Sequence, residues 1–388
     1  MIAAAVTALH LIYSLSSPPY RGTYEEWDTP DGRHRMVTDI PGVFHQDAAY
    51  DGVHAWIVDL SGVSHPLSGA ERARLITEGI QGSLLFSRRP SGTVTPPGGI
   101  PLTIEADAAG HPVREELHPN CGPVEVEKLT EWSKAASVEV PHRIERPEDV
   151  LTFQSAAMEQ VILQPPPIRS PLKKRSVVVP IEAQAFHIFV PVRVNGGERQ
   201  WFVLDTGADF SFVTHGLRAA KSIQTSGSGG SVQAGLAPNA DLQLGDVNVP
   251  LKVIGITPQS EFSKLWGRSF DGVAGYDVIG RFVIRIDWTR RTLQLYDPGH
   301  FEYRGSGAVV PLRFVGNNIV VPIAVTLPDG TKKEIESVID TGSSGTLSFR
   351  SSFSPDVGKT IAALGHGVGG TSKTSIGRIR ALTIGPYT

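Results

Sequence analysis

The feature that most constrains this chain is a strand pattern that occurs twice and ends each time in Asp-Thr-Gly. The first copy runs through residues 200–204 into Asp205-Thr206-Gly207, and the second runs through residues 336–339 into Asp340-Thr341-Gly342. A carboxylate at the end of an apolar strand is costly to bury unless something pairs with it. Two copies in one chain therefore predict that Asp205 and Asp340 are each other's partner.

The sequence around the two triplets repeats as well. Pro180 and Pro191 recur as Pro311 and Pro322, each 131 residues later, whereas the two aspartates are 135 residues apart because the second turn is four residues longer. Downstream, residues 229–231 match 369–371 and residues 242–245 match 382–385. The pattern predicts an internal duplication of a β-unit of roughly 130 residues.

Composition excludes several classes of protein. The chain has 388 residues, 40% hydrophobic and 19% charged, with a formal net charge of −3, which indicates a globular protein of two or three domains without affinity for nucleic acid or anionic membranes. The 41 Gly and 29 Pro favour many short strands joined by turns. The single Cys121 excludes a disulfide framework, and the scattered histidines lack metal-ligand spacing. We expect no metal and no cofactor.

The first 163 residues are predicted to form an antiparallel β domain. Residues 20–60 have strand patterns, including a hairpin signal at Asp51-Gly52. Ser68 can cap a short helix that runs through Glu78, and strand patterns resume at residues 102–106. No cluster of acids, bases or ligands stands out in this region.

Residues 1–15 are mildly apolar and too short to span a membrane. They lack the basic start of a secretory signal, so the sequence shows no clear signal peptide. A degenerate signal, the first helix of a domain and a chain that lacks its true start all stay open, and the last two are favoured.

A proline-rich linker is expected at residues 164–175, because consecutive prolines favour extended geometry and cannot join a sheet interior. Its basic residues 173–175 are interpreted as a solvated tether. The predicted domains are therefore 1–163, the linker, a first lobe at 176–300 and a second lobe at 305–388.

The segment from residue 22 to 59, GTYEEW…DGRHRM…YDGVHAWIVD, resembles the half-barrel sheet of bacterial lipoprotein-carrier domains of the outer-membrane sorting type. The resemblance covers roughly the first 150 residues and implies a location in the bacterial envelope or periplasm.

The duplicated Asp-Thr-Gly resembles the retropepsin-like aspartic proteases, in their bacterial single-chain form with two half-units. The stretch GYDVIGRFVIRIDWTRRTLQLYD carries the element that braces the catalytic loop in that family, here Val278-Ile279-Gly280. The chain ends at Thr388 before a second such element, so the second copy is predicted to be truncated. The implied fold is mainly β: an antiparallel half-barrel-like sheet followed by a duplicated retropepsin-like β-barrel unit.

The resemblance implies a role for each matched residue. Asp205 and Asp340 would be the catalytic dyad, which activates water between two carboxyls that share one proton. The supporting residues would be Thr206, Gly207, Ala208, Thr341, Gly342 and Ser343. The flaps that close over a peptide would contain Gly227, Gly229, Gly230, Gly367, Gly369 and Gly370. In the family a hydroxyl at the position of Ser343 favours ionisation of its aspartate, so Asp340 is predicted to ionise and Asp205 to hold the proton.

Two hypotheses follow. The first is an aspartic endopeptidase, a hydrolase of the envelope acting on a peptide or protein substrate. The alternative is a non-catalytic envelope module that binds apolar or lipoprotein ligands and carries a protease-like scaffold. The glycines at 365, 367 and 370 also match a dinucleotide fingerprint, but strand-like sequence follows where that motif needs a helix.

Overall fold

The computed structural model describes residues 5–58, 62, 64–87, 91–119, 124–166, 170–227, 229–257, 267–315, 318–345, 347–349 and 361–388. The fold is mainly β with a large antiparallel sheet, as the sequence predicts. The chain divides into two compact units, Met1–Pro167 and Ile168–Thr388, which we call unit 1 and unit 2. No helix in the described ranges has the length and apolar character needed to cross a bilayer.

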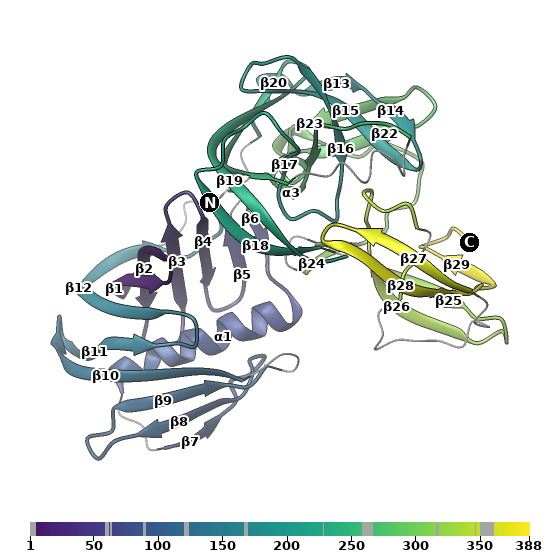
Figure 1. Ribbon diagram of the computed structural model, residues 1–388. Coiled ribbons are helices and arrows are strands. Elements are labelled where there is room, and N and C mark those ends of the chain that lie inside the picture. The colour runs from purple at the N-terminus through teal and green to yellow at the C-terminus, as the bar shows by residue number, and fades with distance from the viewer. Residues whose placement is uncertain are drawn as a thin grey trace. The chain divides into compact units, whose positions relative to one another are not determined.

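The described residues of unit 1 form a twelve-stranded antiparallel sheet, one α-helix and a short 3₁₀ helix (Figure 1). The strand order is β6-β5-β4-β3-β2-β1-β12-β11-β10-β9-β8-β7. The strands are β1 (Ala5–Ser17), β2 (Tyr20–Asp28), β3 (His34–Ile40), β4 (Phe44–Tyr50), β5 (Ala55–Val58), β6 (Ser64–Pro66), β7 (Gly92–Val94), β8 (Leu102–Ala106), β9 (Pro112–Leu117), β10 (Glu125–Ala135), β11 (Val138–Glu145) and β12 (Val150–Ile162). The helices are α1 (Gly69–Ser83) and the short η1 (Leu84–Phe86).

The N-terminal segment is a strand, so the first helix of a domain, one of the two interpretations that we favoured, is wrong. β1 lies in the middle of the sheet, antiparallel to both β2 and β12. Its buried side chains Leu9, Leu11, Tyr13 and Leu15 alternate with more exposed residues. A period of two is the signature of a strand, and it was present in the sequence.

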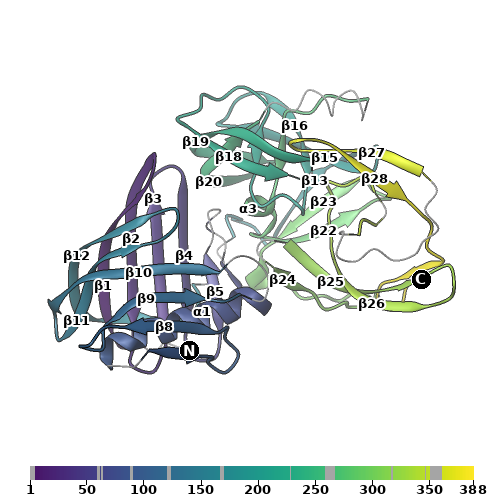
Figure 2. The same ribbon diagram turned by 60° about the horizontal axis from the view of Figure 1, so that its bottom comes forward.

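The helix α1 begins after Ser68, as predicted, and ends at Ser83 rather than Glu78. Both ribbon views show the sheet curving so that α1 crosses its concave side (Figures 1 and 2). On one side Leu75 packs with Ala48 and Ala55, and on the other Ile80 packs with the Leu102 cluster. The sheet therefore wraps around a helix that fills part of its interior.

Unit 2 contains the region whose sequence pattern repeats. Its elements before residue 300 are β13 (Ser176–Pro180), β14 (Glu182–Gln184), β15 (His187–Val194), β16 (Arg199–Leu204), β17 (Phe212–Val213), β18 (Lys221–Gly227), β19 (Gly230–Leu244), β20 (Val247–Ile256), β21 (Gly272–Ala274), α3 (Tyr276–Ile279), β22 (Val283–Asp287), β23 (Thr292–Tyr296) and η2 (Pro298–His300). Its later elements are β24 (Arg313–Val315), β25 (Asn318–Thr326), β26 (Lys332–Val338), β27 (Ile361–Gly367), β28 (Gly370–Ile376) and β29 (Ala381–Thr383).

The first lobe of unit 2 contains an eight-stranded sheet in the order β14-β15-β16-β21-β17-β20-β19-β18. Because β15 also pairs with β19, six of these strands form a closed ring. A separate three-stranded sheet, β13-β23-β22, packs on the same core. The second lobe contains β24, β25, β26 and β29 in one sheet and the hairpin β27-β28.

The repeated sequence has the same strand register in both lobes. Pro191 faces Trp201 across the β15-β16 hairpin, and Pro322 faces Glu336 across β25-β26. Val194 pairs with Leu242, and the matching Val325 pairs with Leu382. The matched positions thus have matched partners.

The two lobes differ in how the strand before each Asp-Thr-Gly is supported. β16 lies between β15 and β21, and its last three residues, Phe202 to Leu204, are buried. β26 is an edge strand of the described sheet, pairs with β25, and has no buried residue. The first strand is therefore a central strand and the second is not.

Candidate binding pocket and paired aspartate loops

The two Asp-Thr-Gly loops of unit 2 meet. Thr206 Oγ1 donates to the Ile339 carbonyl at 2.6 Å, and Thr341 Oγ1 donates to the Leu204 carbonyl at 2.7 Å. Each hydroxyl also accepts from the other threonine's N–H, at 3.1 Å from Thr206 N and 3.0 Å from Thr341 N. We call these reciprocal contacts of residues 205–207 and 340–342 the clasp. It joins the two lobes through backbone and hydroxyl groups.

The two aspartates lie against the opposite loops. Gly207 N–H donates to Asp205 Oδ1 at 2.8 Å, and Gly342 N–H donates to Asp340 Oδ1 at 2.9 Å. A methyl group on Gly342 would lie 2.2 Å from Asp205 Cγ, and one on Gly207 would lie 2.7 Å from Asp340 Cγ. Only glycine allows this close approach.

Asp205 is the more buried of the two aspartates. Burial, and then the Asp340 charge, raise the pKa of Asp205 to about 7. Asp340 itself is exposed. The hydroxyl of Ser343, which we expected to act on Asp340, accepts a hydrogen bond from Gly345 N–H at 3.2 Å. Burial is the largest cause of the raised pKa of Asp205.

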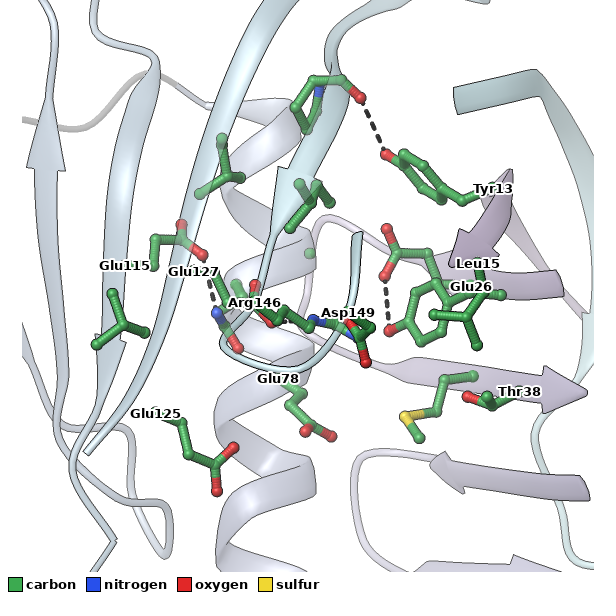
Figure 3. A pocket seen from close by; sticks show the side chains of 18 of the residues that line it. Tyr13, Leu15, Glu26, Thr38, Glu78, Glu115, Glu125, Glu127, Arg146 and Asp149 are labelled. Atoms are coloured by element: carbon green, nitrogen blue, oxygen red, sulfur yellow. Dashed lines mark hydrogen bonds and ion pairs between the residues drawn. The ribbon is translucent and has the colours of Figure 1, made fainter. Parts of the chain in front are cut away.

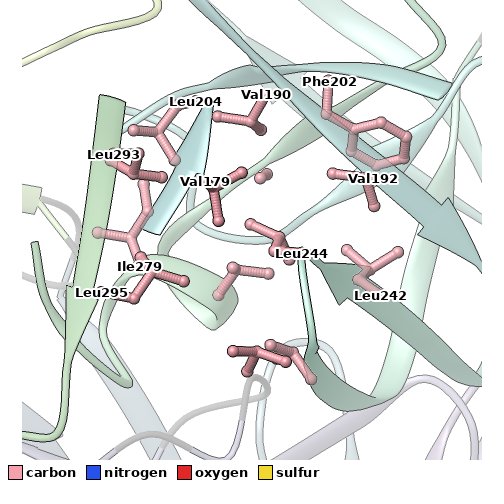
Figure 4. Packing of buried hydrophobic residues seen from close by; sticks show 14 of the residues in the cluster. Val179, Val190, Val192, Phe202, Leu204, Leu242, Leu244, Ile279, Leu293 and Leu295 are labelled. Atoms are coloured by element: carbon pink, nitrogen blue, oxygen red, sulfur yellow. The ribbon is translucent and has the colours of Figure 1, made fainter. Parts of the chain in front are cut away.

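The predicted brace lies behind the first loop. Asp205 N–H donates to the Ala274 carbonyl at 3.0 Å, and Tyr276 N–H donates to the Ala208 carbonyl at 2.9 Å. Val278 and Ile279 of α3 are buried, and Ile279 lies in the same core as Leu204 (Figure 4). Gly280 caps α3, where a Cβ would lie 2.8 Å from the Tyr276 ring.

Ser211 and Asp277 fix this loop further. The Ser211 hydroxyl and N–H both donate to the Asp277 carboxylate, at 2.5 and 2.8 Å, and the hydroxyl accepts from Gly275 N–H. Burial raises the pKa of Asp277 to about 6, although the Ser211 hydrogen bonds lower it. This acid is structural, because its oxygens are used to hold the loop.

The glycines predicted to form flaps lie at the tips of two hairpins, β18-β19 and β27-β28, which touch each other. Gly229 N–H donates to the Val368 carbonyl at 2.9 Å. A Cβ on Gly229 would lie 2.2 Å from the Gly370 oxygen, and one on Gly369 would lie 2.1 Å from the Gly230 oxygen. Gly227 packs in the same way, since its Cβ would lie 2.5 Å from Val368 Cβ. Gly367 ends β27 beside these contacts. Residue 228, between the first flap glycines, lies outside the described residues.

A second site, which sequence reasoning missed, is a pocket of about 640 Å³ in unit 1. Its walls come from β1 to β4, from α1 and from β9 to β11 (Figure 3). Apolar and aromatic side chains form much of the wall: Tyr13, Leu15, Tyr24, Met36, Phe44, Leu84, Leu85, Val124, Val126, Leu129, Trp132 and Ile144.

Charged groups cross the same pocket. Figure 3 shows a band of labelled side chains that runs from Glu115 past Glu127, Arg146 and Asp149 to Glu26. Gln81 Nε2 donates to Glu115 at 2.8 Å, and the Tyr24 hydroxyl donates to Glu26 at 3.2 Å. Arg146 Nε donates to Glu127 at 2.7 Å.

Three carboxyls of the band, Glu26, Glu115 and Asp149, have pKa values that burial raises. Burial, and then the nearby charge of Asp28, raise the pKa of Glu26 to about 8. Burial, and then the charge of Glu127, raise the pKa of Glu115 to about 8. Buried titratable groups in a concave pocket mark a candidate binding site.

Our statement that no acid or ligand cluster stands out in the first 163 residues is therefore wrong. The missed signal is the spacing Glu125-x-Glu127-x-Leu129 on β10, because residues two apart on a strand share one face. Glu115 faces Glu127 across the β9-β10 pair. Within the described ranges no group of three metal-ligating side chains is close enough to hold a metal ion.

Comparison with known proteins gives distant structural neighbours. No family model and no curated protein matches the sequence. A putative outer membrane lipoprotein-sorting protein domain from Vibrio parahaemolyticus is similar over 39% of this chain and 85% of its own, with 7% identity and a TM-score of 0.28. MucB is similar over 69% of this chain and 92% of its own, with 11% identity and a TM-score of 0.18. The complex of MucA and MucB from Pseudomonas aeruginosa is similar over 69% of this chain and 94% of its own, with 11% identity and a TM-score of 0.17.

These comparisons correct the family prediction. The neighbours are a lipoprotein-sorting domain and MucB, and not aspartic peptidases. Our prediction of a retropepsin-like aspartic protease is therefore wrong. The predictions that depended on it, a peptidase or hydrolase activity and a peptide substrate, are not supported either. The low identities and TM-scores transfer no function to this chain.

Proposed function

We propose that unit 1 is a non-catalytic binding module of the bacterial envelope, whose pocket holds an apolar or lipoprotein ligand. The observation that carries this proposal is the pocket of about 640 Å³ with aromatic and aliphatic walls. Ligand sites are concave, mostly apolar and typically about 300–1,000 Å³ in volume. The pocket lies where the sheet curves around α1, so most of its wall comes from strands and the helix, and residues 146–149 of the loop between β11 and β12 complete it.

In this proposal unit 2 is a scaffold of two related β-lobes. The matched strand registers support a duplication, and the reciprocal threonine hydrogen bonds support a permanent contact between the lobes. The residues that we first assigned to a dyad, its support and the flaps then hold the lobes together. Their close packing around Gly342 and Gly369 suits a structural role.

Filling the pocket tests the proposal. Met36 is half-buried and lines the pocket, so Met36→Trp should occupy part of it. Binding of N-phenyl-1-naphthylamine, an uncharged apolar fluorophore, should weaken by about tenfold or more, a loss of about 1.4 kcal/mol. The readout is a fluorescence titration of the full chain.

Met158→Trp is the matched control. Met158 is 44% exposed and is not part of the pocket wall. This variant should bind the fluorophore as the wild type does, and both variants should keep the wild-type circular dichroism. Equal binding by Met36→Trp and wild type would contradict the proposed site, as would an absence of binding by the wild type.

A further inference from the structure

The pocket of unit 1 has a strong excess of negative charge. Its walls contain two arginines, Arg74 and Arg146, and seven carboxyls: Glu26, Glu78, Glu115, Glu125, Glu127, Glu148 and Asp149. A concave, partly desolvated site strengthens the field of such charges. The pocket should therefore favour a cation over an anion of the same size.

Both arginines already form ion pairs with carboxylates of the pocket. Arg74 contacts Glu78 and Glu125, each at 2.8 Å, and Arg146 contacts Glu127 at 2.7 Å. Arg146 also lies over the Tyr24 ring, 4.8 Å from its centroid. These contacts leave Glu26 and Glu115 with neutral donors, Tyr24 and Gln81, and without an ion-pair partner in the described structure. The seven carboxyls of the wall therefore outnumber its cationic side chains, which are Arg74, Arg146 and His34.

Unpaired polar atoms give an independent sign of a ligand. His34 lines the pocket and is 2% exposed, yet its Nε2 has no hydrogen-bond partner in the described part of the chain. Its other nitrogen, Nδ1, contacts Asp28 at 2.7 Å. Trp132 Nε1 and Asp149 Oδ1, also on the pocket wall, are buried and unpaired in the same way. A buried polar atom without a partner is costly, so a ligand should supply partners here.

His34 is charged at neutral pH. Burial lowers its pKa, but the Asp28 carboxylate outweighs burial and raises the pKa to about 9. A protonated imidazole donates from both nitrogens, so the free Nε2–H needs an oxygen acceptor. Trp132 Nε1–H is also a donor. The ligand should therefore carry acceptor oxygens close to its charge.

We propose that this pocket binds a cationic amphiphile: an apolar chain joined through an oxygen-bearing group, such as an ester, to an amine or quaternary ammonium. This inference deepens the proposed function and rests on it. The chain would lie against the aliphatic wall, the oxygen near the imidazole and indole donors, and the cation among the carboxyls and the aromatic side chains of the wall. Cations are attracted both to carboxylates and to aromatic faces.

Binding of such a ligand should strengthen as pH rises. The groups that face Glu26 and Glu115 are Tyr13 on β1, Tyr24 and Asp28 on β2, His34 on β3, Glu78 and Gln81 on α1, Glu127 on β10, and Arg146 and Asp149 after β11. At pH 6 Glu26 and Glu115 are neutral, and above their pKa values, about 8, both carry charge. A cation binds the charged form better, so its affinity increases through this range.

The test compares matched amphiphiles on the full chain, each below its micellar concentration. The probes are lauroylcholine, monolauroylglycerol and dodecyl sulfate, which share a twelve-carbon chain and carry a cationic, a neutral and an anionic head. By calorimetry at pH 8.5, lauroylcholine should bind about tenfold tighter than monolauroylglycerol and far tighter than dodecyl sulfate. The preference should shrink several-fold at pH 6, whereas the affinity for monolauroylglycerol should stay constant.

Glu115→Gln removes one of the titrating charges and keeps a hydrogen-bonding group beside Gln81. It should lower the preference for lauroylcholine over monolauroylglycerol at pH 8.5 about threefold or more, and it should make that preference less dependent on pH. The affinity for monolauroylglycerol should not change. Glu105→Gln, on the exposed part of β8, is the matched control and should change neither. Equal affinity for the cationic and neutral esters overturns this inference and leaves the proposed function standing. Failure of all three amphiphiles to bind overturns both.

Discussion

In unit 1, Glu26 and Glu115 border a pocket of about 640 Å³, whereas in unit 2 Asp205 and Asp340 lie against each other's glycine with no room for a methyl group. Burial is the largest cause of the raised pKa of Glu115 and of Asp205 alike. A raised pKa therefore does not distinguish a binding site from a structural contact. The space beside the carboxyl distinguishes the two, because only open space admits a ligand.

The same contrast applies to the partners of each carboxyl. In the clasp the hydroxyl and N–H groups of Thr206 and Thr341 bond to the opposite loop, and the N–H of each glycine donates to the aspartate of its own loop. In the pocket, His34 Nε2 and Asp149 Oδ1 stay unpaired among the described residues. The clasp is complete without a ligand and the pocket is not.

The sharpest test of this contrast adds one methyl group to the clasp. Gly342→Ala places a Cβ 2.2 Å from Asp205 Cγ, so the loops must separate. We expect a loss of about 3 kcal/mol in the free energy of unfolding, at the upper end for overpacking. Denaturant unfolding of unit 2 in the full chain, followed by tryptophan fluorescence, measures it.

Gly345→Ala is the control, because its Cβ would meet Ser343 Oγ at an ordinary 3.5 Å. The free energy of unfolding of this variant should stay within about 0.5 kcal/mol of the wild-type value. If Gly342→Ala were tolerated as well as Gly345→Ala, the clasp would contain free space and the contrast with the pocket would disappear.

A smaller effect is expected from Thr206→Val. The change removes the hydroxyl that donates to the Ile339 carbonyl and accepts from Thr341 N–H. Leaving such groups unpaired costs about 1–3 kcal/mol, and we expect about 2 kcal/mol here by denaturant unfolding.

Thr341→Val should cost a similar amount, and the double variant should cost less than the sum because the four hydrogen bonds form one network. Thr93→Val, which removes an exposed hydroxyl contact with Thr103, is the control and should cost less than about 0.5 kcal/mol. Additive losses from the two clasp threonines would show that they act separately and not as a clasp.

A further effect concerns pH. The pKa of Asp205 is about 7 in the folded chain and about 3.9 in an unfolded one, so folding takes up a proton. Its stabilising contribution is therefore complete below about pH 4 and is lost as pH rises to about 7. The difference in unfolding free energy between wild type and Asp205→Asn should fall over this range and be level above it.

Taking the difference between wild type and variant separates the contribution of Asp205 from those of Glu26 and Glu115. Those two carboxyls also lower the unfolding free energy as pH rises, up to about pH 8. Asp246→Asn is the opposite control. The Lys174 hydrogen bond lowers the pKa of this exposed acid, so its contribution should be lost only as pH falls, and solvent should keep it small. Parallel curves for wild type and Asp205→Asn would contradict the raised pKa.

Much of unit 2 could be predicted because its signals are local and repeated. Matched prolines gave matched registers in the β15-β16 and β25-β26 hairpins. Because each aspartate ends a strand of the same pattern, the sequence predicted that Asp205 and Asp340 lie together, and the structure places them together. The family and activity inferred from that triplet were wrong by the comparisons with solved structures, since a short motif specifies a local loop and not a function.

The first strand and the pocket show the two ways in which prediction failed. For β1 the alternation of Leu9, Leu11, Tyr13 and Leu15 was sufficient, and a period of two was overlooked. For the pocket no local signal was sufficient, because Glu26, Glu115 and Arg146 come from segments far apart in the sequence.

The sequence by itself determined the β class, the repeat, the turns and the residues of the clasp, because side-chain alternation and turn chemistry act over a few residues. Only the tertiary structure decided that β16 is a central strand and β26 an edge, and that a curved sheet closes around α1. Those features depend on which distant strands pair, as β1 does with β12. The unpaired charge of the pocket follows from that closure, because burial changes a carboxyl only after the sheet has brought its neighbours around it.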